Sequence, residues 1–146
     1  RPYMIESTFG NLSPEWAAGG IVSTPSDLVR FGRALRDGAL LSPEMQKEMF
    51  TFRPSANNEG REYMQGIART PDMFDSMSLI GHSGGTLGFS SILYWFEDID
   101  LIVSASVNVV GMHSGLNPSP FSLFNKNILL PMAVKVQQIC SEKTPD

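Results

Sequence analysis

Two segments in the first third of the chain have the apolar spacing of helices. Thr24 followed by Pro25 is typical of a helix start, and Leu28 and Leu35 fall on one face of the segment that follows. Asp37-Gly38 is typical of a helix end, so the pattern predicts a helix over about 25–36. Ser42-Pro43 repeats the start signal, and this predicts a second, shorter helix over about 43–51.

A third helical pattern lies near the end of the chain. Apolar residues recur there at spacings of three and four residues: Phe121, Phe124, Ile128, Met132, Val136 and Ile139. This spacing predicts a C-terminal helix over about 120–140 that lies on a sheet. Pro131 cannot donate a backbone hydrogen bond, so we expect it to kink or divide this helix.

The middle of the chain has the pattern of strands separated by turns. We predict strands over about 63–68, 78–84, 87–97 and 100–109, with a loop around Thr70-Pro71-Asp72 and a tight acidic turn at 97–100. The strand over 87–97 is apolar on both faces, which indicates a central strand covered on both sides. The predicted fold class is α+β, with an antiparallel sheet of three to five strands flanked by helices, as one domain or a fragment over 1–146.

Composition excludes several classes of partner. The 146 residues are 42% hydrophobic, which allows a real core, and 11 basic against 15 acidic residues give a net charge of -4. These charges are scattered, so we expect neither a nucleic-acid surface nor an anionic membrane as partner. No apolar run approaches the roughly 20 residues of a membrane span, and with one cysteine there is no spacing of metal ligands. We therefore expect no metal and no cofactor.

Reactive side chains on a glycine-rich backbone occur at residues 81–85. Gly81, Ser83 and Gly85 spell G-x-S-x-G, the nucleophile elbow of α/β-hydrolases, which requires a helix after the glycines. The residues from Phe89 onward favour a strand instead, so a hydrolase with Ser83 as nucleophile is the less favoured alternative. Chymotrypsin-like proteases place their general-base histidine before the serine, and no histidine precedes His82.

The surroundings of this motif resemble the penicillin-recognising serine hydrolases. That family includes class C β-lactamases, D-alanyl-D-alanine carboxypeptidases, D-aminopeptidases and related esterases, and its strand triad reads Lys-Thr-Gly or His-x-Gly. His82-Ser83-Gly84 matches the triad, and residues 17–31 match a further family segment with the letters AAGGIVSTPSDLVRF. The resemblance covers about residues 14–110 and implies the C-terminal portion of a β-lactamase/transpeptidase-like fold.

Two other motifs of that family are missing from the chain. The family's nucleophile is the serine of Ser-x-x-Lys, and a Tyr-x-Asn-like motif supplies another general acid or base. No lysine here has a serine three places earlier, and no tyrosine has an asparagine two places later. The chain is therefore interpreted as a C-terminal segment whose nucleophile lies outside it, and which is inactive alone.

The resemblance also implies roles for the motif, on an edge strand beside the nucleophile. The backbone N–H of Gly85 is implied to be one donor of the oxyanion hole, His82 to steady the substrate or move a proton, and Ser83 with Gly84 to bind it. The substrate would be a small amide, ester, peptide or β-lactam, and the parent protein periplasmic or secreted. Near residue 1 the sequence does not have the pattern of a secretion signal.

Two alternatives stay open. The glycines could only shape a bulge and a turn, and the chain could be a catalytically inactive binding or assembly module on the same scaffold. In either reading we expect an apolar surface on this piece, covered by the missing N-terminal portion of the same protein or by a second copy.

Overall fold

The computed structural model describes residues 9–11, 13–56, 60–74, 77–86, 88–108 and 120–142. The chain divides into two compact units. The first comprises Arg1–Ser23, Ser83–Ser91 and Ala105–Asp146, and the second Thr24–His82 and Ile92–Ser104.

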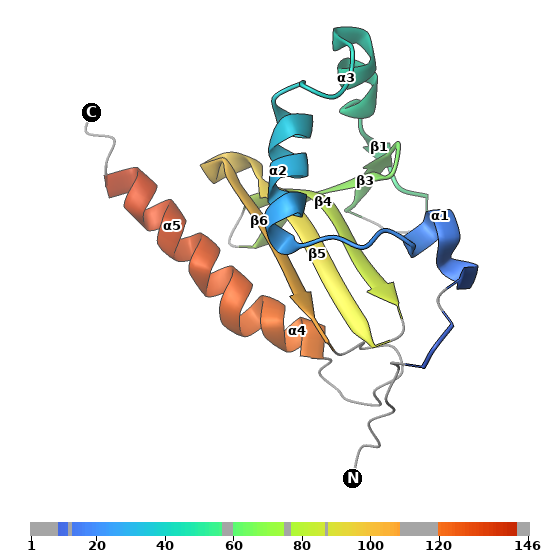
Figure 1. Ribbon diagram of the computed structural model, residues 1–146. Coiled ribbons are helices and arrows are strands. Elements are labelled where there is room, and N and C mark those ends of the chain that lie inside the picture. Colours follow the sequence, from blue (N-terminus) through green and yellow to red (C-terminus); the bar gives the residue numbers. More distant parts are fainter. Residues whose placement is uncertain are drawn as a thin grey trace. The chain divides into compact units, whose positions relative to one another are not determined.

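Six strands form one sheet in the order of the sequence (Figure 1). They are β1 (Arg53–Pro54), β2 (Glu62–Met64), β3 (Ile67–Phe74), β4 (Met77–Thr86), β5 (Phe89–Phe96) and β6 (Leu101–Val107). Neighbouring strands are joined by short connections and β1 to β4 pair antiparallel, so the α+β class and the antiparallel sheet are confirmed. The sheet has six strands where the sequence predicts three to five, because β1 is only two residues long and the predicted strand over 63–68 is divided.

The predicted strand over 63–68 is wrong, because a hairpin turn divides it. β2 ends at Met64 and β3 begins at Ile67, and these two residues pair with each other. Between them Gln65 and Gly66 have φ angles of 46° and 82°. Two consecutive residues with positive φ form the tight turn whose twist suits a two-residue hairpin, and the glycine adopts that backbone without steric cost.

The predicted loop around Thr70-Pro71-Asp72 is also wrong, because β3 continues through it. The pairing of β3 with β4 shifts register between Thr70 and Phe74. Proline cannot donate to the ladder and is tolerated in a strand where such a bulge interrupts the regular pairs. Pro71 therefore sits in a strand irregularity and does not end the strand.

The two capped helices form where the sequence places their signals. α2 (Pro25–Arg36) has the bounds of the predicted helix, and the Thr24 hydroxyl accepts a hydrogen bond from the Asp27 N–H at 3.2 Å. α3 (Pro43–Met49) ends two residues before the predicted bound, and Ser42 caps it in the same way through the Met45 N–H at 3.3 Å. In both cases a local signal of four residues fixes the start of the helix.

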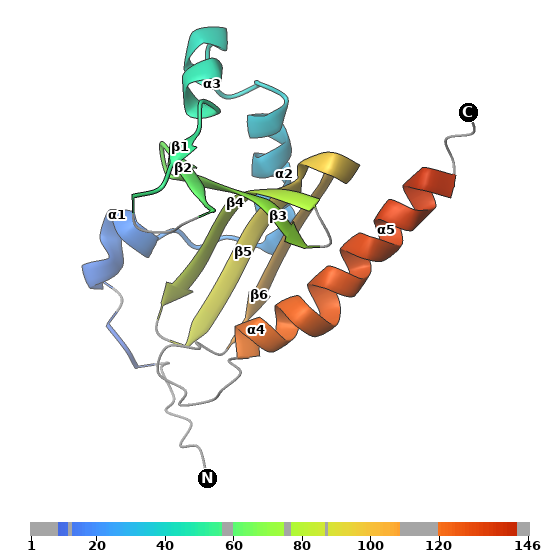
Figure 2. The same ribbon diagram turned by 180° about the vertical axis from the view of Figure 1, so that it is seen from behind.

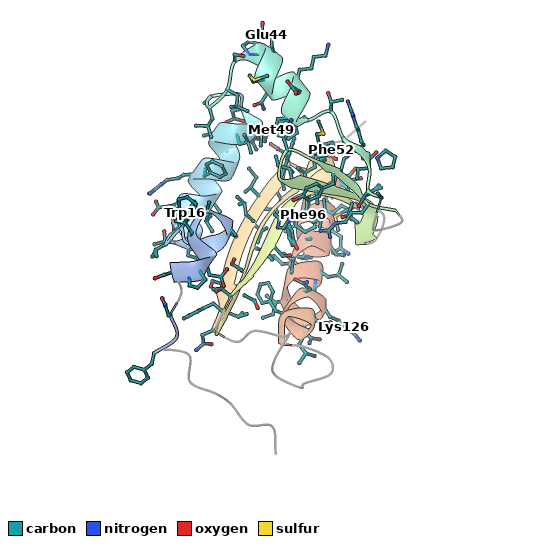
Figure 3. The ribbon with its side chains drawn as sticks, turned by 90° about the vertical axis from the view of Figure 1, so that its right-hand side faces the viewer. Trp16, Glu44, Met49, Phe52, Phe96 and Lys126 are labelled. Carbon is teal, nitrogen blue, oxygen red and sulfur yellow. The ribbon has the colours of Figure 1, made fainter. Side chains whose placement is uncertain are left out.

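In the second unit, α2 packs on one face of the sheet (Figure 1). A side-chain carbon at Gly32 would lie 3.2 Å from methyl groups of Leu93 and Ile102, so the helix approaches closely at this residue. The opposite face of β5 is buried at Ile92, Tyr94 and Phe96, and Figure 3 shows Phe96 among the side chains of the sheet. β5 therefore has the covered faces predicted for a central strand.

Among its described residues, the first unit holds two helical segments. η1 (Ser13–Glu15) runs into α1 (Trp16–Gly19), and α4 (Pro120–Phe124) continues through the π-helical turn η3 (Asn125–Leu129) into α5 (Leu130–Glu142), as Figure 2 shows. The predicted C-terminal helix thus forms, and the wide turn just before Pro131 accommodates the missing N–H without ending the helix. Across the described ranges, no helix is long and apolar enough to cross a membrane.

Candidate functional site

The last residues of β4 carry the whole motif that the sequence singles out. His82, Ser83, Gly84 and Gly85 follow one another before the strand ends at Thr86; His82 and both glycines are exposed and Ser83 is half-buried. β3 pairs with β4 as far as Ala68↔Gly81, and β3 begins at Ile67, so its chain turns away into β2 before reaching Ser83. β4 lies between β3 and β5 and is not the edge strand of the prediction; only its last residues extend past the β3 pairs.

Gly81 allows β4 and β5 to approach closely just before the motif. Its φ is 146°, in the region that favours glycine, and a side-chain carbon there would overlap the carbonyl oxygen of Leu93. No residue with a side chain can occupy this position without moving one of the two backbones. Gly81 therefore fixes where the following residues of β4 begin.

Tyr63 is the residue of the site that the sequence did not indicate. Its hydroxyl oxygen lies 3.3 Å from His82 Nε2, and the two rings meet edge to face with centroids 5.9 Å apart. Tyr63 pairs with Ala68 and Ala68 with Gly81, so the register brings Tyr63 into the row of the residue before His82. The contact forms beside Gly81, whose φ of 146° departs from regular strand geometry. Tyr63 therefore contacts the imidazole through one hydrogen bond and one edge-to-face ring contact.

We predict that Tyr63→Phe changes the chemical environment of His82 Nε2 without unfolding the chain. The substitution keeps the ring contact and removes one exposed hydrogen bond, worth about 1 kcal/mol. Long-range ¹H–¹⁵N NMR of the imidazoles gives the measurement, and the chain's other histidine, His113, which lies outside the described residues, serves as reference. We expect the His82 Nε2 resonance to move and the His113 signals to stay. An unmoved Nε2 signal would show that the hydroxyl does not bond the ring in solution.

The first unit contains the last residues of β4 and the first residues of β5. Gly84 lies close to β5, since a side-chain carbon there would be 2.8 Å from the Ser91 hydroxyl oxygen. The Thr86 hydroxyl donates to Glu15 Oε1 at 3.1 Å and so ties the end of β4 to η1. The hydrogen bond of Thr86 thus holds the end of β4 just after Gly85, and the short distance at Gly84 leaves little room there for a side chain.

The connection after the motif contradicts a nucleophile elbow. β4 ends at Thr86, Gly88 turns with a φ of 82°, and β5 begins at Phe89. An elbow requires a strand-to-helix turn at the serine, and the chain has a strand on both sides of the glycines. The alternative with Ser83 as an elbow nucleophile is therefore wrong.

Two arginines of the second unit serve the fold. Arg36 bonds Asp37 at 2.7 Å and Asp100 at 2.8 Å, and its hydrogen bond with Asp37 raises the pKa of the guanidinium and lowers that of the Asp37 carboxyl. Arg69 bonds Glu97 at 2.8 Å and Glu62 at 3.3 Å, and the hydrogen bond with Glu97 raises its pKa. Both charges are matched by carboxylates, and this pairing stabilises the turn after β5 and the β2–β3 hairpin.

Comparison with known proteins identifies the family. The Beta-lactamase family model matches residues 2–118, so the chain belongs to the Beta-lactamase family. Among solved structures it is similar to a D-stereospecific amidohydrolase from Streptomyces sp., with 28% identity and a TM-score of 0.50 over 57% of this chain. It is also similar to the D-amino acid amidase from Ochrobactrum anthropi SV3 complexed with D-phenylalanine, with 28% identity and a TM-score of 0.51 over 60% of this chain.

The matched region is a small part of each relative. The alignments cover 25% of the Streptomyces amidohydrolase and 29% of the Ochrobactrum amidase. The family and both structural relatives give the chain the scaffold of a β-lactamase-like serine hydrolase.

Proposed function

We propose that this chain supplies the substrate-binding strand and one oxyanion N–H of a serine hydrolase that works through an acyl-enzyme. The observation that supports this is the position of His82–Gly85 at the end of β4, past the last pair with β3. His82, Gly84 and Gly85 are exposed there, so an extended substrate can reach the end of this strand and lie along it.

Each residue of the motif has a distinct part in this proposal. The Gly85 N–H donates to the oxyanion that forms when a serine attacks the carbonyl, and glycine lets the carbonyl carbon approach without a Cβ in the way. His82, held by Tyr63, steadies the substrate or moves a proton, which imidazole can do near neutral pH. Ser83 and Gly84 bind the substrate.

The attacking serine comes from outside these 146 residues in this proposal. The chain has no Ser-x-x-Lys, and it spans only about a quarter of the two relatives. An apolar segment of the first unit supports this, since the side chains of Phe9, Trp16, Ile21 and Val22 are between 83% and 98% exposed. Exposed apolar side chains in such a group are typical of a surface that another part covers, here the N-terminal portion of the same protein.

The substrate class follows from the relatives. Both are named for D-stereospecific or D-amino acid amide hydrolysis, so we favour an amide of a D-amino acid among the amides, esters, peptides and β-lactams that the scaffold serves. In the reaction the serine Oγ bonds to the carbonyl carbon, ammonia or an amine leaves with a proton, and water then releases the acid.

We predict that the purified chain alone does not hydrolyse nitrocefin, p-nitrophenyl acetate or a D-amino acid amide. A longer protein carrying Ser-x-x-Lys ahead of these residues should hydrolyse at least one of them, because it joins a nucleophile to the oxyanion donor. In the matched variant Ser83→Ala, a fluorophosphonate probe, which reacts with the nucleophilic serine, should still label the longer protein. Turnover by the chain alone that disappears in Ser83→Ala would overturn the proposal.

Solution mass separates the alternative. An inactive assembly module covers its exposed apolar segment with a second copy, so a stable dimer of the chain, together with no hydrolysis by the longer protein, would favour that module.

A further inference from the structure

The second unit contains an apolar cavity between α2 and the sheet. Its volume is about 140 Å³, and both α2 and the four strands β3 to β6 contribute to it. The lining includes Phe31 and Leu35 from the helix, and Ile80, Leu93 and Ile102 from the strands. Apolar atoms make up almost all of the wall, so water inside would find few hydrogen-bond partners.

Part of the cavity wall consists of residues that contact one another or share Asp100 as a hydrogen-bond partner. Asp100 accepts hydrogen bonds from Arg36 at 2.8 Å and from Trp95 Nε1 at 3.1 Å. The Trp95 ring also meets Phe50 edge to face, with centroids 6.3 Å apart. These contacts hold Arg36, Phe50 and Trp95 in the wall, and they pair the polar atoms Arg36 Nη1 and Trp95 Nε1 with the Asp100 carboxylate.

The lining also includes residues at the surface, one of which belongs to the candidate site. Three lining residues are exposed, namely Phe31, Gly66 and His82. Gly66 is the turn residue of the β2–β3 hairpin, and no atom lies within 4 Å of where its side chain would begin. His82 is therefore an exposed lining residue of this apolar cavity, and its imidazole contacts the Tyr63 hydroxyl.

The size of the cavity defines what it can take. An engineered protein cavity of about 150 Å³ lined by leucine, isoleucine and phenylalanine stays dry and binds benzene. We propose that this cavity binds the apolar side group of the substrate, a benzene-sized ring, with the polar end of the molecule at His82. This assignment of the substrate rests on the proposed function, whereas the binding of a ring to the cavity does not.

Titration of the chain with toluene tests the cavity directly. In ¹³C-methyl NMR spectra we expect saturable shifts of the Leu35, Leu93 and Ile102 methyl groups, while the Leu129 methyl groups, in the other unit, stay in place. Leu35→Phe fills the space and should weaken toluene binding roughly tenfold or more. Leu28→Phe, on the same helix and outside the lining, is the matched control and should bind as the unmodified chain does.

The outcomes separate this inference from the proposed function. No saturable shift in the unmodified chain overturns the cavity as a ring site, whatever the variants do. Ring binding without any hydrolysis by the longer protein supports the cavity and removes only the proposed function. In an active longer protein, Leu35→Phe should raise KM for an amide with a benzyl side group roughly tenfold relative to one with a methyl group. Equal KM changes for the two amides would overturn the assignment to the substrate.

Discussion

Gly81→Ala is expected to prevent the second unit from folding as it does here. The added carbon would overlap the Leu93 carbonyl oxygen, and the φ of 146° is one that alanine rarely adopts. Relief requires β4 and β5 to separate, which breaks their pairing next to the buried Ile80 and Ile92. We expect a loss of more than about 3 kcal/mol in the free energy of unfolding, against the 5–15 kcal/mol typical of a whole domain.

Urea denaturation followed by tryptophan fluorescence measures this loss. Gly38→Ala is the matched control, because Gly38 also has a positive φ, 71°, but no atom within 4 Å of its missing side chain. Its cost should be only the backbone strain, about 1 kcal/mol. If the two variants had the same midpoint, the close approach of β4 and β5 at Gly81 would not exist in solution.

The parts of the fold that short signals determine could be predicted from the sequence. Thr24-Pro25 and Ser42-Pro43 start α2 and α3 at the predicted residues, because a cap satisfies backbone N–H groups within one turn. The turn at Gln65-Gly66 was not predicted, because glutamine seldom takes a positive φ and the tertiary pairing of β2 with β3 imposes it. The loop predicted at Pro71 was wrong for a different reason. Proline usually marks a loop, but here it lies where the pairing of β3 with β4 is irregular.

The candidate site also has one part that the sequence predicts and other parts that only the fold brings together. His82 to Gly85 are contiguous, so the motif can be read without knowing the fold. Tyr63 lies 19 residues earlier, and the pairing of β2 with β3 and of β3 with β4 aligns it with Gly81, the residue next to His82. The cavity is more distant still from any sequence signal, since its wall combines a helix, a hairpin turn and four strands. The apolar periodicity of a single segment cannot predict a cavity that several elements form together.

Gly85→Pro is expected to lower kcat of the longer, Ser-x-x-Lys-containing protein by a factor of about 10²–10³, the usual effect of removing one oxyanion donor. Proline lacks the backbone N–H, and Gly85 is exposed one residue before the end of β4, where the change disturbs few pairs. KM should change much less, because the N–H acts on the charge that develops in the transition state.

The variant Gly85→Ala distinguishes the effect of losing the N–H donor from the effect of losing space beside the substrate. Alanine keeps the donor and adds one methyl group, so its kcat should stay within roughly tenfold of the unmodified protein. Comparable losses in both variants would mean that glycine is needed for room alone and that the oxyanion donor lies elsewhere. A large loss in the proline variant only, with the imidazole signals of His82 unchanged, would place the effect on the Gly85 N–H, because the contact between Tyr63 and His82 would then be intact. That combination also distinguishes a catalytic strand from an assembly module, since a module that only covers a surface has no transition state for this N–H to stabilise.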